Sequence, residues 1–323
     1  MKTPIFCLLP LCLLACSEPA MQNTASASTP AASAVATANA AQSNAAAMLL
    51  NTLALTHITQ TATWQSLLEQ AITLRKQVQE VLPHASPEQA NALYDEHVRI
   101  MNQLLTKLND VDSATLENYF MQVEYNEQTK TETVPPELLA KQKQLQAAGL
   151  QYTDAGEGMA MITIVPDYYA TLFGKQLSPD YHAYVAIQAE HNKQTSIKDG
   201  GLAISYDDFG KRLADWENFV ATYPDSKKQV FSRCQMRTHR DIFLLGLDNT
   251  PTFEFDNDKK LVPESAQAWQ NFVARHPDSP TTAIIQSLQG KMSKKNMEAA
   301  LNQIQPNTEN SECDFGDQYI YIF

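Results

Sequence analysis

Apolar side chains recur at alternating spacings of three and four residues along much of this chain. Over residues 64–82 this period predicts an amphipathic helix, which Pro83 ends. The segment Ser86-Pro87-Glu88-Gln89 is typical of a helix N-terminus, and a second apolar stripe runs over residues 90–108. The two stripes predict an antiparallel helical hairpin.

Capping residues and prolines divide the rest of the chain into further helices, interrupted once by a β-prone stretch. Glycines between the β-prone runs 150–153 and 159–165 predict a small hairpin, and a polar turn is expected at 198–201. The alternating aromatic residues of 319–323 predict a strand packed on this hairpin. Further helices are expected from about 47, 113 to 127, 136 to 149, 166 to 173, and after Ser178, Ser205 and Ser293. The predicted fold class is mainly α, with helical hairpins and a small antiparallel sheet.

An internal repeat is the most informative feature of the second half. Residues 216–226 (WENFVATYPDS) recur as 269–279 (WQNFVARHPDS), with eight of eleven positions identical and 53 residues between the copies. In each copy Trp, Phe and Val lie on one helical face, Pro ends the helix, and Asp-Ser caps a second helix beginning at Lys227 or Pro280. Each copy is therefore a helix-turn-helix unit whose aromatic face needs a neighbour to bury it.

The pattern of these units resembles the repeats of tetratricopeptide-like outer-membrane lipoproteins, among them assembly scaffolds and cell-division coordinators. The resemblance covers about residues 205–304 and implies stacked helical pairs that bind other proteins. The period of 53 residues exceeds the roughly 34 of a tetratricopeptide repeat.

The N-terminus resembles the signal peptide and lipobox of a bacterial lipoprotein. Lys2 precedes a short apolar core, and Leu13-Leu14-Ala15-Cys16 stands where the cleavage site would be. The apolar core is too short to span a bilayer, which takes about 20 residues. The resemblance implies removal of residues 1–15 and acylation of Cys16, so that several acyl chains anchor the protein stably. Ser17 follows the cysteine where an Asp would favour the inner membrane, so the resemblance implies the outer membrane.

Composition divides the mature chain into a tether and a folded part. Ala, Ser and Thr make up 20 of the 30 residues of 17–46, a composition that cannot bury enough apolar surface to order itself. The expected organisation is a lipidated tether over 16–46, an N-terminal helical region over 47–149, and a β-hairpin with the helical repeats over 150–323.

The charge balance and the cysteines restrict the function further. The formal net charge of −12 argues against nucleic acid as a partner. Of the five cysteines, two leave with the signal peptide and Cys16 is lipidated, which leaves Cys234 and Cys313. In an oxidising envelope these two predict a disulfide, the alternative being two buried free thiols.

No catalytic or metal-binding motif stands out. The seven histidines have no metal-ligand spacing, and His97, on an apolar stripe, is expected to be a core residue. The acidic, aromatic segment 248–258 lacks the spacing of an EF-hand and is expected to be a solvated connection. We therefore expect no metal, no cofactor and no enzymatic activity.

A basic ridge is expected on the helix after Ser226. Arg233, Arg237 and Arg240 follow one another at helical spacing, with Lys227 and Lys228 at its start. Such a ridge on an acidic molecule could dock an acidic partner or an anionic envelope polymer. The alternative is a solvated face paired with neighbouring carboxylates, which contributes little.

These observations predict a non-enzymatic scaffold or adaptor, anchored in the outer membrane on its periplasmic side, that binds envelope proteins. Two alternatives stay open at this point. One is an envelope enzyme acting on peptidoglycan or polysaccharide through a pair of carboxylates. The other is an inhibitor or immunity lipoprotein that binds a single secreted enzyme.

Overall fold

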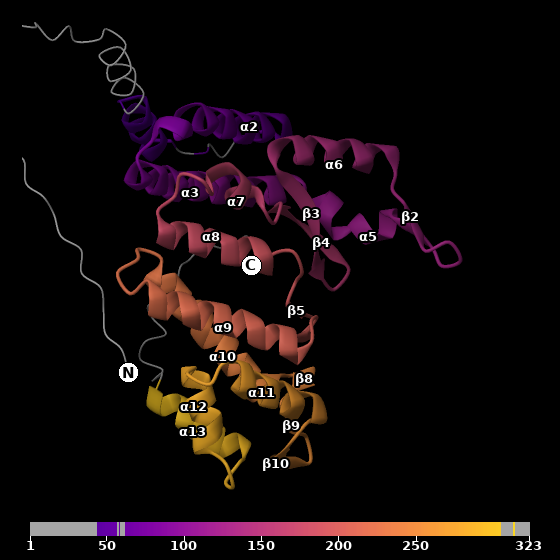
Figure 1. The fold of residues 1–323 in the computed structure, drawn as a ribbon. Helices are drawn as coiled ribbons and strands as arrows, with labels where there is room; N and C mark the ends of the chain where they lie inside the picture. The colour runs from indigo at the N-terminus through magenta and orange to yellow at the C-terminus, as the bar shows by residue number, and fades with distance from the viewer. Residues whose placement is uncertain (1–43, 57, 59–61, 305–312, 314–323) are drawn as a thin grey trace, which may run out of the picture.

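The computed structural model describes residues 44–56, 58, 62–304 and 313, which are mainly α-helical with short two-stranded antiparallel ribbons. The helices follow one another in layers (Figure 1). The first layer holds α2 (Trp64–Val81) and α3 (Pro87–Val111), and the last holds α12 (Pro280–Ser287) and α13 (Lys294–Ile304). The fold class predicted from the sequence is confirmed.

The predicted first hairpin is present, with the expected caps. The hydroxyl oxygen of Ser86 accepts a hydrogen bond from the backbone N–H of Gln89, and the side-chain oxygen of Gln89 accepts one from the backbone N–H of Ser86. Together the two bonds form a capping box at the start of α3. A 3-10 turn, η1 (Leu82–His84), follows α2 at Pro83. Residues 44–54 form an additional helix, so the segment 44–46, expected in the tether, is helical, and Ala46 is buried. The rest of the expected tether and the signal segment lie outside the described residues.

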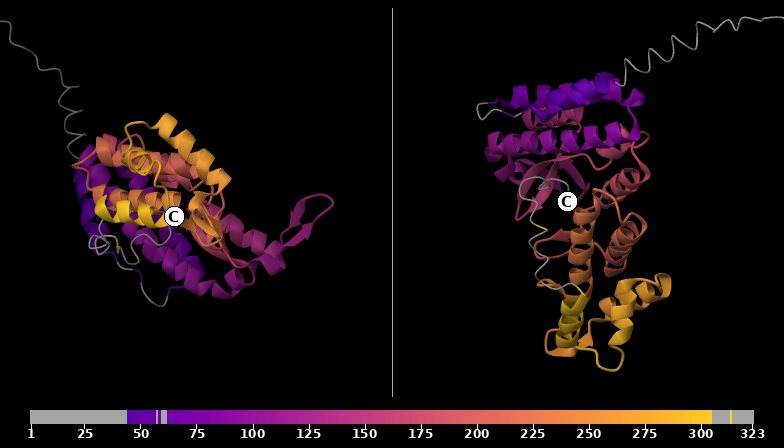
Figure 2. Two further views of the ribbon diagram at one scale, coloured as in Figure 1. Left: turned by 90° about the horizontal axis from the view of Figure 1, so that it is seen from below. Right: turned by 90° about the vertical axis from the view of Figure 1, so that its left-hand side faces the viewer.

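The single helix expected over 113–127 is replaced by two short helices and a ribbon. These elements are α4 (Ser113–Glu117), α5 (Tyr119–Gln122), β1 (Glu124–Asn126) and β2 (Thr131–Thr133). The side chain of Asn126 accepts the amides of Gln128 and Thr129, an Asx turn that favours a hairpin over a continuing helix. The ribbon projects from the body of the molecule (Figure 2).

The predicted 150–165 hairpin is confirmed as β3 (Leu150–Gly156) and β4 (Met159–Ile164). It is reached from α6 (Pro136–Ala148) through Gly149, whose φ of +80° lies in the left-handed region. A Cβ at this position would lie 2.3 Å from Cε2 of Tyr168 in α7 (Tyr168–Phe173). Gly149 is therefore required by its backbone angle and by a close approach.

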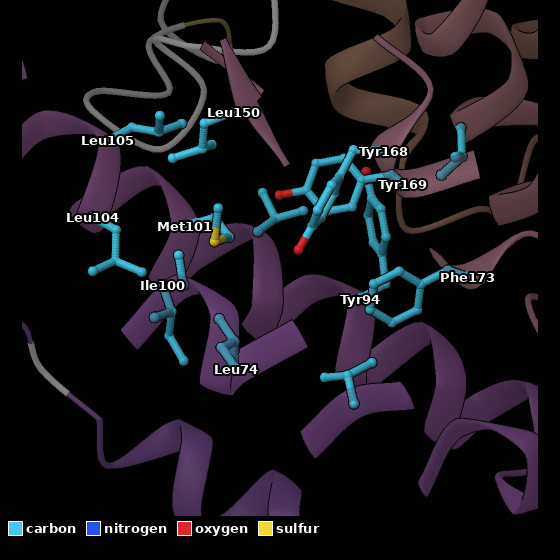
Figure 3. Packing of buried hydrophobic residues seen from close by; sticks show 14 of the residues in the cluster. Leu74, Tyr94, Ile100, Met101, Leu104, Leu105, Leu150, Tyr168, Tyr169 and Phe173 are labelled. Carbon is cyan, nitrogen blue, oxygen red and sulfur yellow. The ribbon is translucent and has the colours of Figure 1, made fainter. Parts of the chain in front are cut away.

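The first hydrophobic core lies among these elements (Figure 3). Tyr94 contacts the rings of Tyr169 and Phe173 edge-on, with centroids 5.2 and 5.6 Å apart. His97 is fully buried beside them, where desolvation lowers its pKa to about 3. It is a core histidine, as the sequence predicted, and its neutral ring contacts the hydroxyl of Tyr168 at 3.3 Å.

The chain then continues through helices that carry the repeat. These elements are α8 (Pro179–His191), β5 (Ile197–Lys198), β6 (Gly201–Leu202), α9 (Tyr206–Thr222), α10 (Gln229–Leu245), β7 (Gly246–Leu247), β8 (Thr250–Pro251), β9 (Phe253–Glu254), β10 (Asn257–Leu261) and α11 (Pro263–Arg275). The predicted caps at Ser205 and Ser293 are present, each accepting the amide three residues on.

Both copies of the repeat fold as helix, turn and helix. Tyr223 and His276, which follow the first helix of each copy, share a backbone conformation, with φ and ψ of −124° and 61° and of −127° and 61°. The amides of Ser226 and Ser279 close the two turns by donating to the carbonyl oxygens of these residues at 3.1 Å. The helix-turn-helix prediction is confirmed, although α10 begins two residues after Lys227.

The long repeat period results from an insertion between α10 and α11. Ribbons β7–β8 and β9–β10 fill residues 246–261, and without them the spacing would be close to the roughly 34 residues of a tetratricopeptide repeat. The expected solvated connection over 248–258 is thus partly ordered into strands. Phe253 is buried in it, whereas Phe255 is 99% exposed.

Helix α9 packs on both of the molecule's hydrophobic cores. Trp216 and Phe219 belong to the first core, and Phe209 and Leu213 belong to the second, which holds the helices after α9. The hairpin residues Leu150 and Ile162 also lie in the first core. The boundary expected after residue 149 therefore runs through the first hydrophobic core, because residues on both sides of it pack together there.

Replacing Gly149 by Ala should destabilise the protein by about 2–4 kcal/mol, because left-handed backbone strain adds to overpacking against Tyr168. Gly158→Ala is the matched control, since Gly158 has the same φ of +80° and no atom within 4 Å of a Cβ there. This control should cost only about 1 kcal/mol. Urea denaturation of both variants measures the difference, and equal costs would show that Tyr168 yields to the added methyl group.

Candidate functional site

A cavity of about 520 Å³ lies between the β3–β4 ribbon, the end of α8 with the segment 192–198, and helices α9 and α10. Its volume is within the range of about 300–1,000 Å³ that small-molecule sites occupy. The cavity lies where the two hydrophobic cores meet, because Phe209 of the second core and Trp216 and Phe231 of the first all line it.

Aromatic rings form the inner wall of the cavity. The ring of His191 meets that of Trp216 edge-on, with centroids 5.6 Å apart. The ring of His239 stacks on Phe209, with centroids 4.9 Å apart and an interplanar angle of 11°. These contacts fix the rings and leave a preformed apolar wall.

His239 presents an acceptor nitrogen within this wall. Its Nδ1 lies 2.7 Å from the carbonyl oxygen of Gln235, and because a carbonyl oxygen only accepts, Nδ1 carries the proton. Burial lowers the pKa of His239 to about 4, so the ring is neutral at pH 7. Nε2 of the neutral ring is then an acceptor.

His191 is held by a carboxylate. Its Nε2 lies 3.0 Å from Oδ2 of Asp215, on the neighbouring helix α9. Within the described chain, no serine, threonine or thiol is hydrogen-bonded to His191 or His239.

Arg212 lines the cavity from α9, and it is half-buried. One of its Nη atoms donates to the carbonyl oxygen of Gln194 at 2.7 Å. No carboxylate of the described residues lies within ion-pair distance of it. Desolvation lowers the pKa of Arg212, against the opposing effect of more distant carboxylates.

Asp154 is the one carboxylate among the described residues that line the cavity, and it is paired with Lys198. The hydrogen bond from Lys198 keeps the pKa of Asp154 low. A glycosidase needs two carboxylates, one of them able to hold a proton. The described lining of this cavity does not form that arrangement.

Cys234 and Cys313 form a disulfide at the cavity wall, with their Cα atoms 5.6 Å apart. The cysteine count predicted this pairing. The two residues are 79 apart in sequence, a loop for which the chain-entropy model gives about 4–5 kcal/mol of stabilisation.

The prediction that Arg240 belongs to an exposed basic ridge is wrong. Arg240 is only 4% exposed, and it donates to Oε1 of Glu217 at 2.8 Å and to the hydroxyl of Thr281 at 2.9 Å. The helical spacing placed it opposite the apolar face, but α9 and α12 cover that side of α10. Arg233 and Arg237, the other two candidates, are half-buried.

Lys228, at the expected start of the ridge, is also buried. Its ammonium group pairs with Asp95 of α3 at 2.5 Å and lies over the rings of Tyr94 and Tyr181, 4.9 Å from each centroid. Burial lowers its pKa despite the carboxylate. The lysine therefore joins the start of α10 to α3 in the first layer.

The sequence alone did not bring the cavity residues together. His191 and His239 are far apart in the chain, and only the fold makes them neighbours. One local signal existed, because Phe209, Arg212 and Trp216 share one face of α9 at helical spacing and so combine a cation with two aromatic rings.

No protein-family model, no curated protein and no solved structure matches this chain. Within the described ranges, no group of three or more His, Cys, Asp or Glu side chains could hold a metal ion. No helix in the same ranges is long and apolar enough to cross a membrane. The lipidation candidate Cys16 and the expected strand over 319–323 lie outside the described residues.

Removing the guanidinium in Arg240→Ala should cost about 3–5 kcal/mol, because Glu217 would be left buried without its cation. Lys211→Ala is the control. Lys211 pairs with Asp208 at 2.6 Å on the surface, where its side chain is 55% exposed, and an exposed pair contributes about 0.2–1 kcal/mol. Chemical denaturation of the two variants should separate them clearly, and similar losses would contradict a structural role for the buried pair.

Proposed function

We propose that this chain is an outer-membrane-anchored periplasmic lipoprotein that acts as a non-enzymatic, protein-binding scaffold in the cell envelope. The observation that carries the proposal is the stacking of the two repeat units. Helices α9 and α10 form one antiparallel pair, α11 and α12 form the next, and α9 packs beside α11. Stacked helical pairs of this kind create extended surfaces that bind other proteins.

The anchor supports the same function. The lipobox-like run Leu13-Leu14-Ala15-Cys16 supports acylation of Cys16, and the Ala/Ser/Thr-rich composition after it supports a tether between the membrane and the folded part. A tethered binding module meets membrane-associated partners at a raised effective concentration. The cysteine pair Cys234–Cys313 is in keeping with an oxidising compartment.

The docking surface is narrower than the sequence suggested. Arg240 and Lys228 are buried in ion pairs, so the proposed basic docking surface on α10 keeps the half-buried Arg233 and Arg237 of the expected ridge. An acidic partner segment would complement these two side chains.

Replacing Cys16 by Ser should abolish labelling with palmitate and release the protein from the membrane fraction, because no acyl chain could then be attached. Cys12→Ser is the matched control, since the same substitution four residues earlier leaves the proposed lipidation site intact. Membrane fractionation of labelled cells measures both variants. Labelled, membrane-bound Cys16→Ser protein would overturn the anchor.

In-cell crosslinking of the tagged, lipidated protein, followed by mass spectrometry, should recover a stoichiometric envelope protein. The double variant Arg233→Glu/Arg237→Glu should reduce its recovery by about tenfold, which corresponds to about 1.4 kcal/mol of binding free energy. The control Lys294→Glu/Lys295→Glu makes the same charge change on exposed positions of α13 and should leave recovery unchanged.

The outcomes separate the alternatives. A stoichiometric partner that survives the Arg233/Arg237 reversal would keep the scaffold and exclude this surface. A tight one-to-one complex with a secreted enzyme would favour an inhibitor. No stoichiometric partner in any growth condition would overturn the scaffold proposal.

A further inference from the structure

We propose that the cavity between the β3–β4 ribbon and helices α8, α9 and α10 binds a small ligand that combines an aromatic or apolar body with a single carboxylate. This inference is independent of the scaffold function. It rests on the charge of the lining, on one unpartnered donor, and on the comparison between the two copies of the repeat.

The lining carries a positive charge in an acidic protein. The described charged groups around the cavity are Asp154, Lys198 and Arg212, and the first two form an ion pair. Arg212 is therefore left as the excess charge, although the whole chain has a formal charge of −12. Arg212 has no carboxylate within ion-pair distance among the described residues, although Asp208, Glu190 and Asp215 act on it from farther away. A ligand carboxylate in the cavity would supply a direct, charge-assisted hydrogen-bond partner.

Trp216 supplies the unpartnered donor. It lines the cavity, its side chain is buried, and its Nε1 has no hydrogen-bond partner among the described residues. Buried polar atoms without partners are rare, and they mark strain, water or a missing ligand.

The second repeat shows that an unpartnered tryptophan N–H is not a property of the repeat itself. Trp269 occupies the equivalent position, and its Nε1 donates to the carbonyl oxygen of Phe243 at 3.0 Å. The same tryptophan is therefore satisfied in one unit and unsatisfied in the unit that faces the cavity.

Both donors come from one helical face. Arg212 and Trp216 are four residues apart on α9 and thus neighbours on its surface. A carboxylate bound to Arg212 would lie beside the indole of Trp216, and a shift of the ring toward the cavity would make its buried Nε1 a second donor to that carboxylate. The rings of Phe209, His239 and Phe231 provide the apolar wall for the rest of the ligand, and neutral His239 adds no second cation there.

Isothermal titration of the lipidated full chain in detergent micelles with 1-naphthoate tests this proposal, after subtraction of the same titration into protein-free micelles. We expect saturable one-to-one binding. The neutral analogue 1-naphthamide should bind at least about tenfold more weakly, because it lacks the charge that Arg212 recognises.

Two variants identify the site. Arg212→Gln should weaken 1-naphthoate binding about tenfold or more, and Trp216→Phe, which keeps the ring and removes the N–H, about threefold to tenfold. The matched controls are Arg275→Gln, at an arginine whose side chain is 49% exposed, and Trp269→Phe in the second unit; both should bind like the unchanged protein. Circular dichroism establishes that each variant is folded.

The proposal is overturned if 1-naphthoate shows no saturable binding, or if it binds equally well to folded Arg212→Gln and Trp216→Phe. It is also overturned if 1-naphthamide binds as tightly as 1-naphthoate. None of these results bears on the crosslinked partner, so failure of the ligand site and failure of the scaffold are distinguishable.

Discussion

Helix α9 is the element on which the rest of the structure depends, because it has an apolar face toward each of the two cores. Trp216 and Phe219 complete the first core, while Phe209 and Leu213 begin the second. A helix buried on two sides must meet its neighbours closely. A Cβ at position 210 would lie 3.0 Å from the ring of Phe243, so Gly210 allows α9 and α10 to approach each other. Loosening α9 would therefore disturb both halves of the molecule and the cavity between them.

Carboxylates of one layer fix the turns of the next. The hydroxyl of Ser226, in the turn before α10, donates to Asp180 of α8, and the hydroxyl of Ser279, in the turn before α12, donates to Glu217 of α9. A buried cation repeats the arrangement, with Lys228 on Asp95 and Arg240 on Glu217. Apolar packing alone tolerates sliding, whereas a buried charge must keep its partner. We infer that these pairs set the register of the stack.

Local rules of the sequence predicted the parts of the fold that local forces decide. Capping residues and period placed α2, α3 and α6, and the Pro-Asp-Ser turn was right in both copies of the repeat, because caps and proline act within one helical turn. The β1–β2 ribbon was missed, since its Asx turn at Asn126 competes with a helical pattern of similar strength. The cavity could not be predicted, because His191, Arg212 and His239 come from three helices that only the tertiary packing brings together. The prediction for Arg240 was wrong for the same reason. Helical spacing within α10 alone cannot show that α9 and α12 cover the face on which Arg240 lies.

The two repeat units show how one sequence pattern can serve two purposes. The second unit packs its tryptophan into a closed core, where Trp269 finds a backbone acceptor. The first unit meets a β-ribbon and the end of α8 instead of another helical pair, and these elements do not fill the space above Trp216. A repeat that ends against a different architecture leaves donors and apolar rings that a symmetrical stack would have satisfied. The candidate site of this protein therefore lies at the junction where the repeat symmetry is broken, and Arg212 is foremost among the residues that distinguish it from the second unit.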